Sequence, residues 1–310
     1  MRGLQLIPYN TKIDFVGKKK FFFAISAVLM IVSLVGVFIS GINFGIDFKG
    51  GILIEARTET PMNIGDLREK LLDLKLGDLK IQESGSDRDI MIRIEKQPGG
   101  EQSQEAALAK VKETLGAGVD YRRVETVGPK ISADLIDNAV LAVLWALVGI
   151  LIYVWFRFEW QFSLCAIIAL IHDPVVILGL YGLTSLEFNE TTLIALLTTI
   201  GYSINDTVVI YDRIRDNLRK YKKAPLTEVL NRSINETLTR TTLTSGTTMI
   251  ALLCLYFFGG SVVATFTLPI IVGVAVGTYS SICLAAPLLL YFNIYRGEDS
   301  HLSQENERLA

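Results

Sequence analysis

Apolar segments long enough to cross a membrane recur along this chain, and one long polar stretch follows the first of them. A helix of about twenty apolar residues spans a hydrocarbon core of about 30 Å. The first such segment covers residues 21–40, and Lys18, Lys19 and Lys20 directly precede it. Its apolar length exceeds that of a signal peptide, so we expect a retained helix. The other five predicted spans cover residues 138–157, 163–183, 190–211, 239–258 and 266–293.

Residues 41–137 have the interspersed charges and short apolar patterns of a soluble domain. Strand patterns occur at 50–58, on both sides of a turn within 79–96, and at 119–128. Helical spacing of apolar residues occurs at 63–76 and at 101–115. The order βαββαβ is the split βαβ, or ferredoxin-like, arrangement, and we find no catalytic constellation within it. The predicted fold is therefore a polytopic α-helical membrane protein with six transmembrane helices and one small α+β ferredoxin-like domain.

The charges of the connecting segments predict which ends face the cytoplasm. The predicted loop at 212–238 is basic, with Arg215, Arg219, Lys220, Lys222, Lys223 and Arg232. The two short connections on the other side contain no lysine or arginine. Because cytoplasmic loops carry the excess of Lys and Arg, we expect residues 1–20, this loop and the tail 294–310 in the cytoplasm. The α+β domain would then lie in the periplasm of a bacterium, beside the cell inner membrane.

Composition excludes several classes of function. Half of the residues are hydrophobic and the formal net charge is −2, which argues for a membrane protein and against a nucleic-acid surface. The three cysteines lie in separate apolar runs, and His172 and His301 are far apart, so we predict no disulfide and no metal site. No P-loop sequence occurs, so we expect neither ATP hydrolysis nor a bound cofactor.

Asp206 lies well inside the apolar length of the fourth predicted span. A charge at that depth costs roughly 3 kcal/mol or more on insertion scales, so an intramembrane acid is a functional-site hypothesis by default. Tyr202 lies four residues earlier on the same helical face and Asn205 is adjacent, so either side chain could hydrogen-bond the acid. The alternative is a structural aspartate that is hydrogen-bonded to a neighbouring helix.

The fifth predicted span has a purely apolar part of only about ten residues, so reaching across about 30 Å of hydrocarbon also requires the polar residues 239–248. Arg240 thereby lies near the cytoplasmic edge of the core, at nearly the depth of Asp206, with Thr244 one turn further in. An Asp–Arg pair that opens and closes is what a proton carrier needs, because the acid stays ionised beside the cation and takes a proton without it. The alternative is a static ion pair that joins two helices.

Asp173 is a second acid, near the middle of the third predicted span. His172 precedes it, and Pro174 follows and frees a backbone carbonyl. Asp173 could belong to the same proton relay, or it could be satisfied locally at the proline break. The residues alone leave both interpretations open.

Four motifs resemble the SecD/SecF family of bacterial protein-export subunits, specifically its smaller subunit. They are NFGIDFKGG (43–51, with Gly45, Asp47, Gly50 and Gly51), HDPVVILGLYGL (172–183), GYSINDTVVIYDRIRDN (201–217) and NETLTRTTLTSGTT (235–248). The resemblance covers nearly the whole chain. The fourth-span motif is also similar to that of the resistance–nodulation–division (RND) exporters, which usually carry two adjacent acids there. Asn205 stands in place of one of them, so this helix lacks a second acid for a relay of its own.

The resemblance implies a subunit that acts with SecD and uses the proton-motive force to complete preprotein export through the SecYEG channel. It implies the proton-site acid at Asp206 and the fifth-span arginine at Arg240. Further implied partners are YajC and YidC, the unfolded preprotein and membrane lipids. Two alternatives stay open: half of an RND-type proton-coupled exporter of small molecules or lipids, and a purely structural subunit of the translocase.

Overall fold

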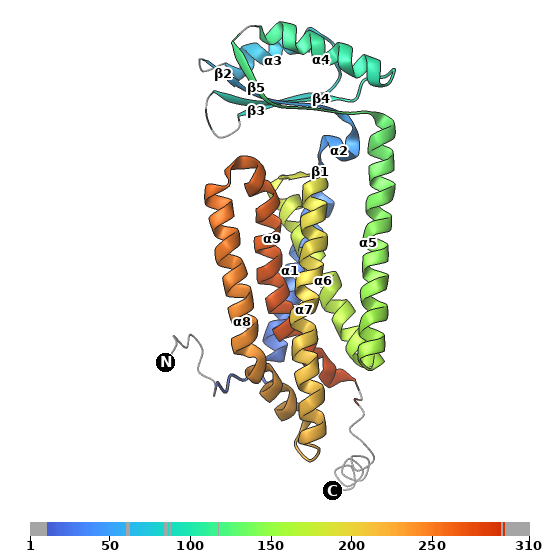
Figure 1. Ribbon diagram of the computed structural model, residues 1–310, viewed down its shortest axis with the longest axis vertical. Coiled ribbons are helices and arrows are strands. Elements are labelled where there is room, and N and C mark those ends of the chain that lie inside the picture. The colour runs from blue at the N-terminus through green and yellow to red at the C-terminus, as the bar shows by residue number, and fades with distance from the viewer. Residues whose placement is uncertain are drawn as a thin grey trace. The chain divides into compact units, whose positions relative to one another are not determined.

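The computed structural model describes residues 11–59, 63–83, 86, 88–116, 118–292 and 294 (Figure 1). The chain divides into two compact units. A helical unit comprises the residues up to Ile42, Trp145–Leu186 and the residues from Ile194 onward, and an α+β unit comprises Asn43–Leu144 and Glu187–Leu193. The expectations for residues 1–10 and for the tail after residue 294 lie outside the described residues.

The α+β unit contains the predicted βαββαβ order, which confirms the ferredoxin-like arrangement. Its four-stranded antiparallel sheet has the order β3-β4-β2-β5, and α3 and α4 cover one face of it (Figure 1). Ile52 and Ile54 of β2 and Ile92 of β4 are fully buried because alternate residues of each strand face these helices. The bounds are β2 (Gly51–Thr58), α3 (Ile64–Leu72), β3 (Leu79–Glu83), β4 (Asp89–Glu95), α4 (Glu101–Leu115) and β5 (Val119–Val127).

Three short elements join this sheet to the adjoining chain and were not predicted. The strand β1 (Asn43–Phe44) pairs in parallel with β6 (Glu187–Phe188), and the single-turn helix α2 (Ile46–Lys49) follows β1. Two-residue strands carry no readable alternation, because two positions cannot establish a period of two. Their pairing depends on segments that are far apart in sequence.

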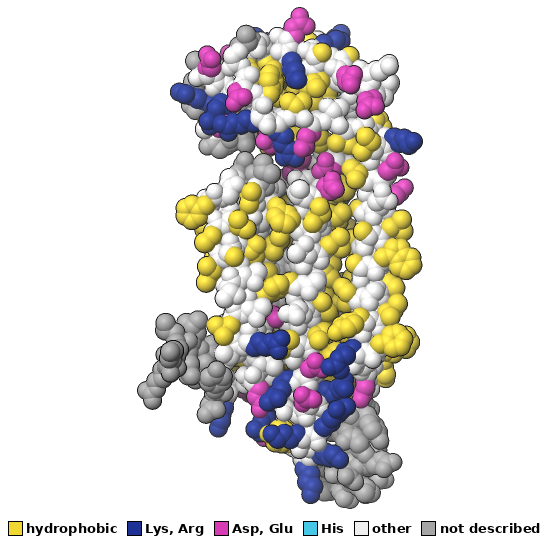
Figure 2. All heavy atoms as spheres, in the orientation of Figure 1, with side chains coloured by type: hydrophobic (Ala, Val, Ile, Leu, Met, Phe, Trp, Pro, Cys, Tyr) yellow, Lys and Arg dark blue, Asp and Glu magenta, His cyan; other side chains and the backbone are white. Residues whose placement is uncertain are grey.

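Among the described residues, six helical segments are long and apolar enough to cross a membrane, which confirms the predicted number of spans. Figure 2 shows hydrophobic side chains along these helices, and lysines and arginines around the adjoining ends of α7 and α8. The bounds are α1 (Lys19–Ser40), α5 (Pro129–Arg157), α6 (Trp160–Thr184), α7 (Glu190–Lys220), α8 (Leu226–Phe258) and the segment Val263–Tyr291. This last segment includes most of α9 (Gly260–Ser280), then the π-helical η1 (Ser281–Ala285), α10 (Ala286–Leu288) and the 3-10 helix η2 (Leu289–Tyr291).

The expected basic loop at 212–238 is mostly helical. Helix α7 continues to Lys220 and α8 already begins at Leu226, so only a short turn joins them. The helices extend beyond their apolar parts because Leu218 of α7 and Leu230 of α8 are buried in one hydrophobic cluster. In the same way α5 begins at Pro129, eight residues before the expected end of the soluble domain at residue 137.

Small residues let the helices of the membrane unit approach one another closely. A Cβ atom added to Gly179 of α6 would lie 2.2 Å from the Cβ atom of Ser33 on α1. A Cβ atom added to Gly277 of α9 would lie 2.9 Å from the Cβ atom of Ser203 on α7. Packing of this kind is how helices associate where lipid offers no hydrophobic contrast. It brings polar side chains of α6, α7 and α9 within hydrogen-bonding distance of each other.

Candidate intramembrane acidic site

Asp206 is buried between three helices, with an exposed fraction of 2%. The Ser245 hydroxyl of α8 donates to its Oδ2 atom at 3.3 Å, and the Thr278 hydroxyl of α9 donates to the same atom at 3.5 Å. Ser245 and Thr278 also hydrogen-bond each other at 2.7 Å. One carboxylate oxygen of α7 is therefore held by hydroxyl groups from two other spanning helices.

Arg240 lies close enough to Asp206 to attract its carboxylate electrostatically, as the shared depth predicts. No ion pair within 4.0 Å joins the two among the described residues, and the Arg240 side chain is exposed. The Thr244 hydroxyl donates to the backbone oxygen of Arg240 at 3.0 Å, which satisfies Thr244 within its own helix. The structure thus brings Asp206 and Arg240 into one region, but on α8 it is the Ser245 hydroxyl that contacts the carboxylate.

The two neighbours expected to hydrogen-bond Asp206 do not do so in the described part of the chain. The Tyr202 hydroxyl donates to Thr248 of α8 at 3.5 Å instead. Asn205 is exposed, because adjacent residues of a helix point about 100° apart and only Asp206 faces the interior. Ser245 lies in the threonine-rich segment that the sequence singled out, whereas no sequence signal marks Thr278.

Asp173 is fully buried, with an exposed fraction of 0%, and its carboxylate contacts both side chains of other helices and its own neighbour His172. Ser203 of α7 and Ser280 of α9 donate to its Oδ2 atom at 2.5 Å and 2.9 Å. Nδ1 of His172 lies 3.0 Å from its Oδ1 atom. The Nε2 atom of His172 is buried and has no hydrogen-bond partner within the described residues.

Hydroxyl groups connect the surroundings of the two acids. Ser281 donates to the backbone oxygen of Ser203 at 3.2 Å and exchanges a hydrogen bond with Thr207 at 2.8 Å. Ser203 binds Asp173, and Thr207 directly follows Asp206 in α7. The polar surroundings of the two acids therefore adjoin one another along α7 and η1.

The glycine motif predicted after the first span forms a joint within the α+β unit. The backbone N–H group of Gly45 donates to Phe188 at 2.8 Å, and the Asp47 carboxylate accepts from the backbone N–H group of Glu190 at 3.0 Å. Gly50 and Gly51 have φ values of 73° and 132°, a region that favours glycine. The motif thus has a structural role, because its hydrogen bonds connect α2 and β2 to the start of α7.

Comparisons with known proteins agree with this architecture. Residues 107–294 match the family model "Protein export membrane protein SecD/SecF, C-terminal", and residues 35–62 match the model "SecD/SecF GG Motif". A protein translocase subunit SecF from Rickettsia bellii is 42% identical over 291 residues, covering 93% of this chain and 96% of the relative. The SecF subunit of Cereibacter sphaeroides is 44% identical over 316 residues, covering 99% of this chain and 98% of that one.

Among solved structures, a SecDF from Thermus thermophilus, described as a translocon-associated membrane protein, matches with a TM-score of 0.81 and 37% identity. The match covers 92% of this chain, and this chain spans 39% of that one. Together with the six candidate spanning helices of the described residues, these matches identify a polytopic membrane protein of the protein-export class. The chain belongs to the SecD/SecF family of protein-export membrane proteins, and within that family it is similar in length and sequence to the SecF subunits described above.

Proposed function

We propose that the chain acts with SecD to couple the proton-motive force to late-stage translocation of preproteins across the bacterial inner membrane. The observation that carries this proposal is the burial of Asp206 between α7, α8 and α9. A buried carboxylate in a membrane is energetically costly, so its presence indicates a function. Proton transfer is the function that the titration of a carboxylate provides. The proton gradient is the energy source, and neither a cofactor nor enzymatic turnover is required.

The hydrogen bonds of Asp206 suggest how protonation could move helices. As a carboxylate, Asp206 accepts from Ser245 and Thr278 and attracts Arg240. Protonation removes the charge and turns one oxygen into a donor, which weakens the hold of α7 on α8 and α9. Because α8 carries both Ser245 and Arg240, its position is the variable that the proton would control.

Asp173 is the second proposed member of the relay. The hydroxyl seam through Ser203, Ser281 and Thr207 supports a connection between the surroundings of the two acids. The Ser281 hydroxyl bonds the backbone oxygen of Ser203, which only accepts, so the seam supports a shared polar region between the acids and not a continuous chain of hydroxyl groups.

The exposed polar face of α8 supports a second membrane half as partner. Arg240 and Thr247 are exposed and lie seven residues apart on one side of a spanning helix, and such a polar face must contact protein or water rather than lipid. SecD is the proposed occupant, and the SecYEG channel, YajC, YidC and the unfolded preprotein are the further proposed partners. We also propose that both termini are cytoplasmic and that the α+β unit is periplasmic.

A purely structural role is the second candidate, because hydrogen bonds that join three helices would also stabilise a static subunit. The two are separated by measuring preprotein release from spheroplasts that contain Asp206→Asn beside wild-type SecD, with and without the proton-motive force. Asp212→Asn is the matched control, since Asp212 lies on the same helix in an exposed ion pair with Arg157.

Under the proposal, Asp206→Asn forms normal amounts of complex and loses only the force-dependent part of release, whereas Asp212→Asn retains it. Normal force-dependent release by Asp206→Asn would reject proton coupling at this residue. A lowered amount of complex with unchanged release per complex would favour the structural role.

A further inference from the structure

Two adjoining cavities of the α+β unit differ sharply in their chemistry. One, of about 440 Å³, is an apolar trough whose lining includes Phe44, Phe188 and the α5 residues Ile136 and Val140. The other, of about 620 Å³, has a mixed lining in which charged side chains stand beside apolar ones. The two share Phe44, Phe48, Lys49 and Ile136 in their linings, so they form one continuous amphipathic space.

Aromatic rings and the first half of α5 build the apolar trough. Phe44, Phe48 and Phe188 pack as a triad with ring centroids 5.8–5.9 Å apart. On α5, Ile136 and Val140 are 42% and 53% exposed, on a helix that is apolar enough to cross a membrane. Among the described residues that line the trough, Lys49 alone carries a charge.

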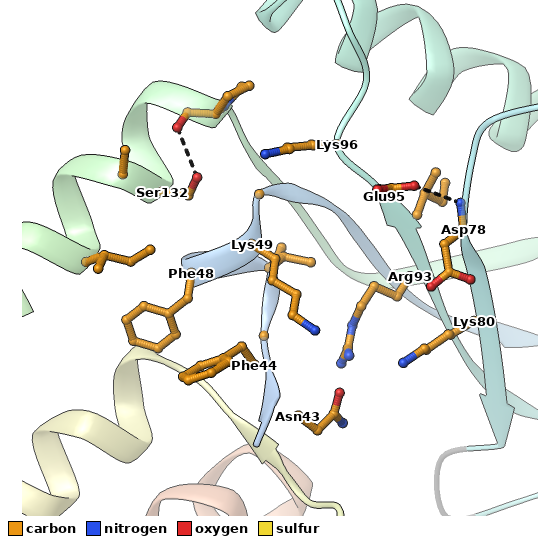
Figure 3. Close-up of a pocket in the computed structure, with 17 residues that line it drawn as sticks. Asn43, Phe44, Phe48, Lys49, Asp78, Lys80, Arg93, Glu95, Lys96 and Ser132 are labelled. Carbon is orange, nitrogen blue, oxygen red and sulfur yellow. Dashed lines mark hydrogen bonds between the residues drawn. The ribbon is translucent and has the colours of Figure 1, made fainter. Parts of the chain in front are cut away.

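Basic side chains converge in the cavity with the mixed lining. Figure 3 shows the ends of Lys49, Arg93 and Lys80 directed toward a common space beside Asn43, while the rings of Phe44 and Phe48 lie on the side nearer α5. Lys49 and Lys80 are exposed and form no ion pair among the described residues. A cationic end therefore continues directly into an apolar end.

Two acids of this region have partners within it. Glu187 forms an ion pair with Arg93, and Glu95 accepts a hydrogen bond from the backbone N–H group of Asp78 at 3.1 Å. Lys96 adds a further cation to the lining, and Asp78 is its other acid. The lining of this cavity thus has more cations than acids, and Lys49 also lines the trough.

We propose that this amphipathic space binds one anionic phospholipid, with the phosphate between Lys49 and Lys80 and an acyl chain along the phenylalanine triad and α5. The positive charges of the lysines complement the negative charge of a phosphate. The trough lies along a helix whose apolar side chains are compatible with the hydrocarbon of a membrane. A protein helix is a poorer fit, because a helix with side chains is about 10–12 Å across and about 440 Å³ holds less than roughly one turn of it.

The test uses the full chain in nanodiscs of phosphatidylcholine that contain a trace of a photoreactive lipid with a diazirine on one acyl chain. The probe has a phosphatidylglycerol headgroup in one arm and a phosphatidylcholine headgroup in the other. Labelled peptides are located by mass spectrometry. We expect the phosphatidylglycerol probe to label α2 and residues 136–144 of α5 in preference to the phosphatidylcholine probe. Free glycerol phosphate should not compete, because it lacks the acyl chain.

Two variants and a matched control locate the determinants. The double variant Lys49→Gln/Lys80→Gln should reduce labelling by the anionic probe roughly 25-fold, since one cation near a membrane surface contributes about fivefold. The control Lys70→Gln/Lys110→Gln removes two exposed lysines of α3 and α4 and should leave labelling unchanged. Ala139→Trp, which fills the trough, should abolish labelling at α5 while circular dichroism and elution volume stay normal.

Equal labelling by the two probes would identify ordinary surrounding lipid and overturn the proposal. Unchanged labelling of Lys49→Gln/Lys80→Gln would do the same. Displacement of the anionic probe by a hydrophobic signal-sequence peptide, with other lipid labelling unchanged, would assign the trough to a protein segment instead.

Discussion

The hydroxyl of Ser245 on α8 donates a hydrogen bond to the carboxylate of Asp206 on α7, at 3.3 Å between Oγ and Oδ2. This contact joins the two helices at Asp206, one of two buried acids in the described part of the helical unit. It also stands where a direct contact between Asp206 and Arg240 had been expected. The consequence is that α8 senses the ionisation of Asp206 through a neutral donor as well as through a cation.

Ser245→Ala should weaken this link without removing the titrating group. Interhelical hydrogen bonds in membranes contribute about 0.6 kcal/mol on average and up to about 1.7 kcal/mol, so the loss of stability should fall in that range. Force-dependent preprotein release should decrease more than with Thr247→Ala, whose hydroxyl bonds only its own helix. Equal effects of the two variants on release would contradict the role of Ser245.

Arg240→Met should retain normal assembly and lose force-dependent release, because the acid loses the cation that favours its ionised form. Arg240→Lys should restore part of the release, since the positive charge returns without the planar guanidinium. Lys223→Met removes an exposed cation from the turn after α7 and serves as the control. Complex levels are followed by immunoblot, and the prediction fails if Met and Lys at position 240 behave alike.

Asp173→Asn tests whether the second acid belongs to the relay. The substitution weakens the hydrogen bonds from Ser203 and Ser280, and a bond to a charged group contributes about 1.5–3 kcal/mol, so thermal stability should decrease. In the complex that still assembles, preprotein release should no longer depend on the proton-motive force. Ser203→Ala should lower stability and leave that dependence in place. A force dependence preserved by Asp173→Asn would leave this acid with a packing role only.

The α+β unit should lose stability in acid through Asp89. The Arg57 side chain donates two hydrogen bonds to Asp89, at 2.8 Å and 2.7 Å, and with Ser86 holds its pKa well below the usual range. A depressed folded pKa gives stability that is present above the unfolded pKa, about 3.9, and is lost as pH falls through the folded value. The protection of β2 and β4 amides against hydrogen exchange, relative to their intrinsic rates, should therefore decrease below about pH 4 in the wild type. This decrease should be smaller in Asp89→Asn. A variant that kept the wild-type acid dependence would disprove this assignment.

Gly51→Ala should disrupt the sheet. The residue has a φ of 132°, and a Cβ atom there would lie 2.3 Å from the backbone oxygen of Ile94. Strained backbone conformations of this kind cost on the order of 1–3 kcal/mol, to which the clash adds. Gly128→Ala is the control, because a Cβ atom at that position meets no neighbour within 4 Å. Thermal unfolding followed by circular dichroism should show a lower midpoint for Gly51→Ala alone.

Much of the fold could be predicted because its signals are local. A spanning helix is predominantly apolar, and a sheet strand such as β4 alternates its buried residues, so the spans and the strands at 50–58 and within 79–96 can be predicted without a structure. The extension of α7 and α8 through the segment 212–238 could not be read in this way. Their ends are polar on one side, and only the contact between buried residues such as Leu218 and Leu230 shows that they continue as helices.

The sequence by itself determined that Asp206 lies within an apolar segment long enough to span a membrane, and it predicts Arg240 at a similar depth, because helix rise and apolar length set both expectations. Only the tertiary structure decided which groups contact the acids. Ser245 and Thr278 bind Asp206, and Ser280 binds Asp173 from 107 positions away in sequence. Such partners depend on how closely small residues let the helices pack, and spacing along a single helix carries no information about a neighbouring one.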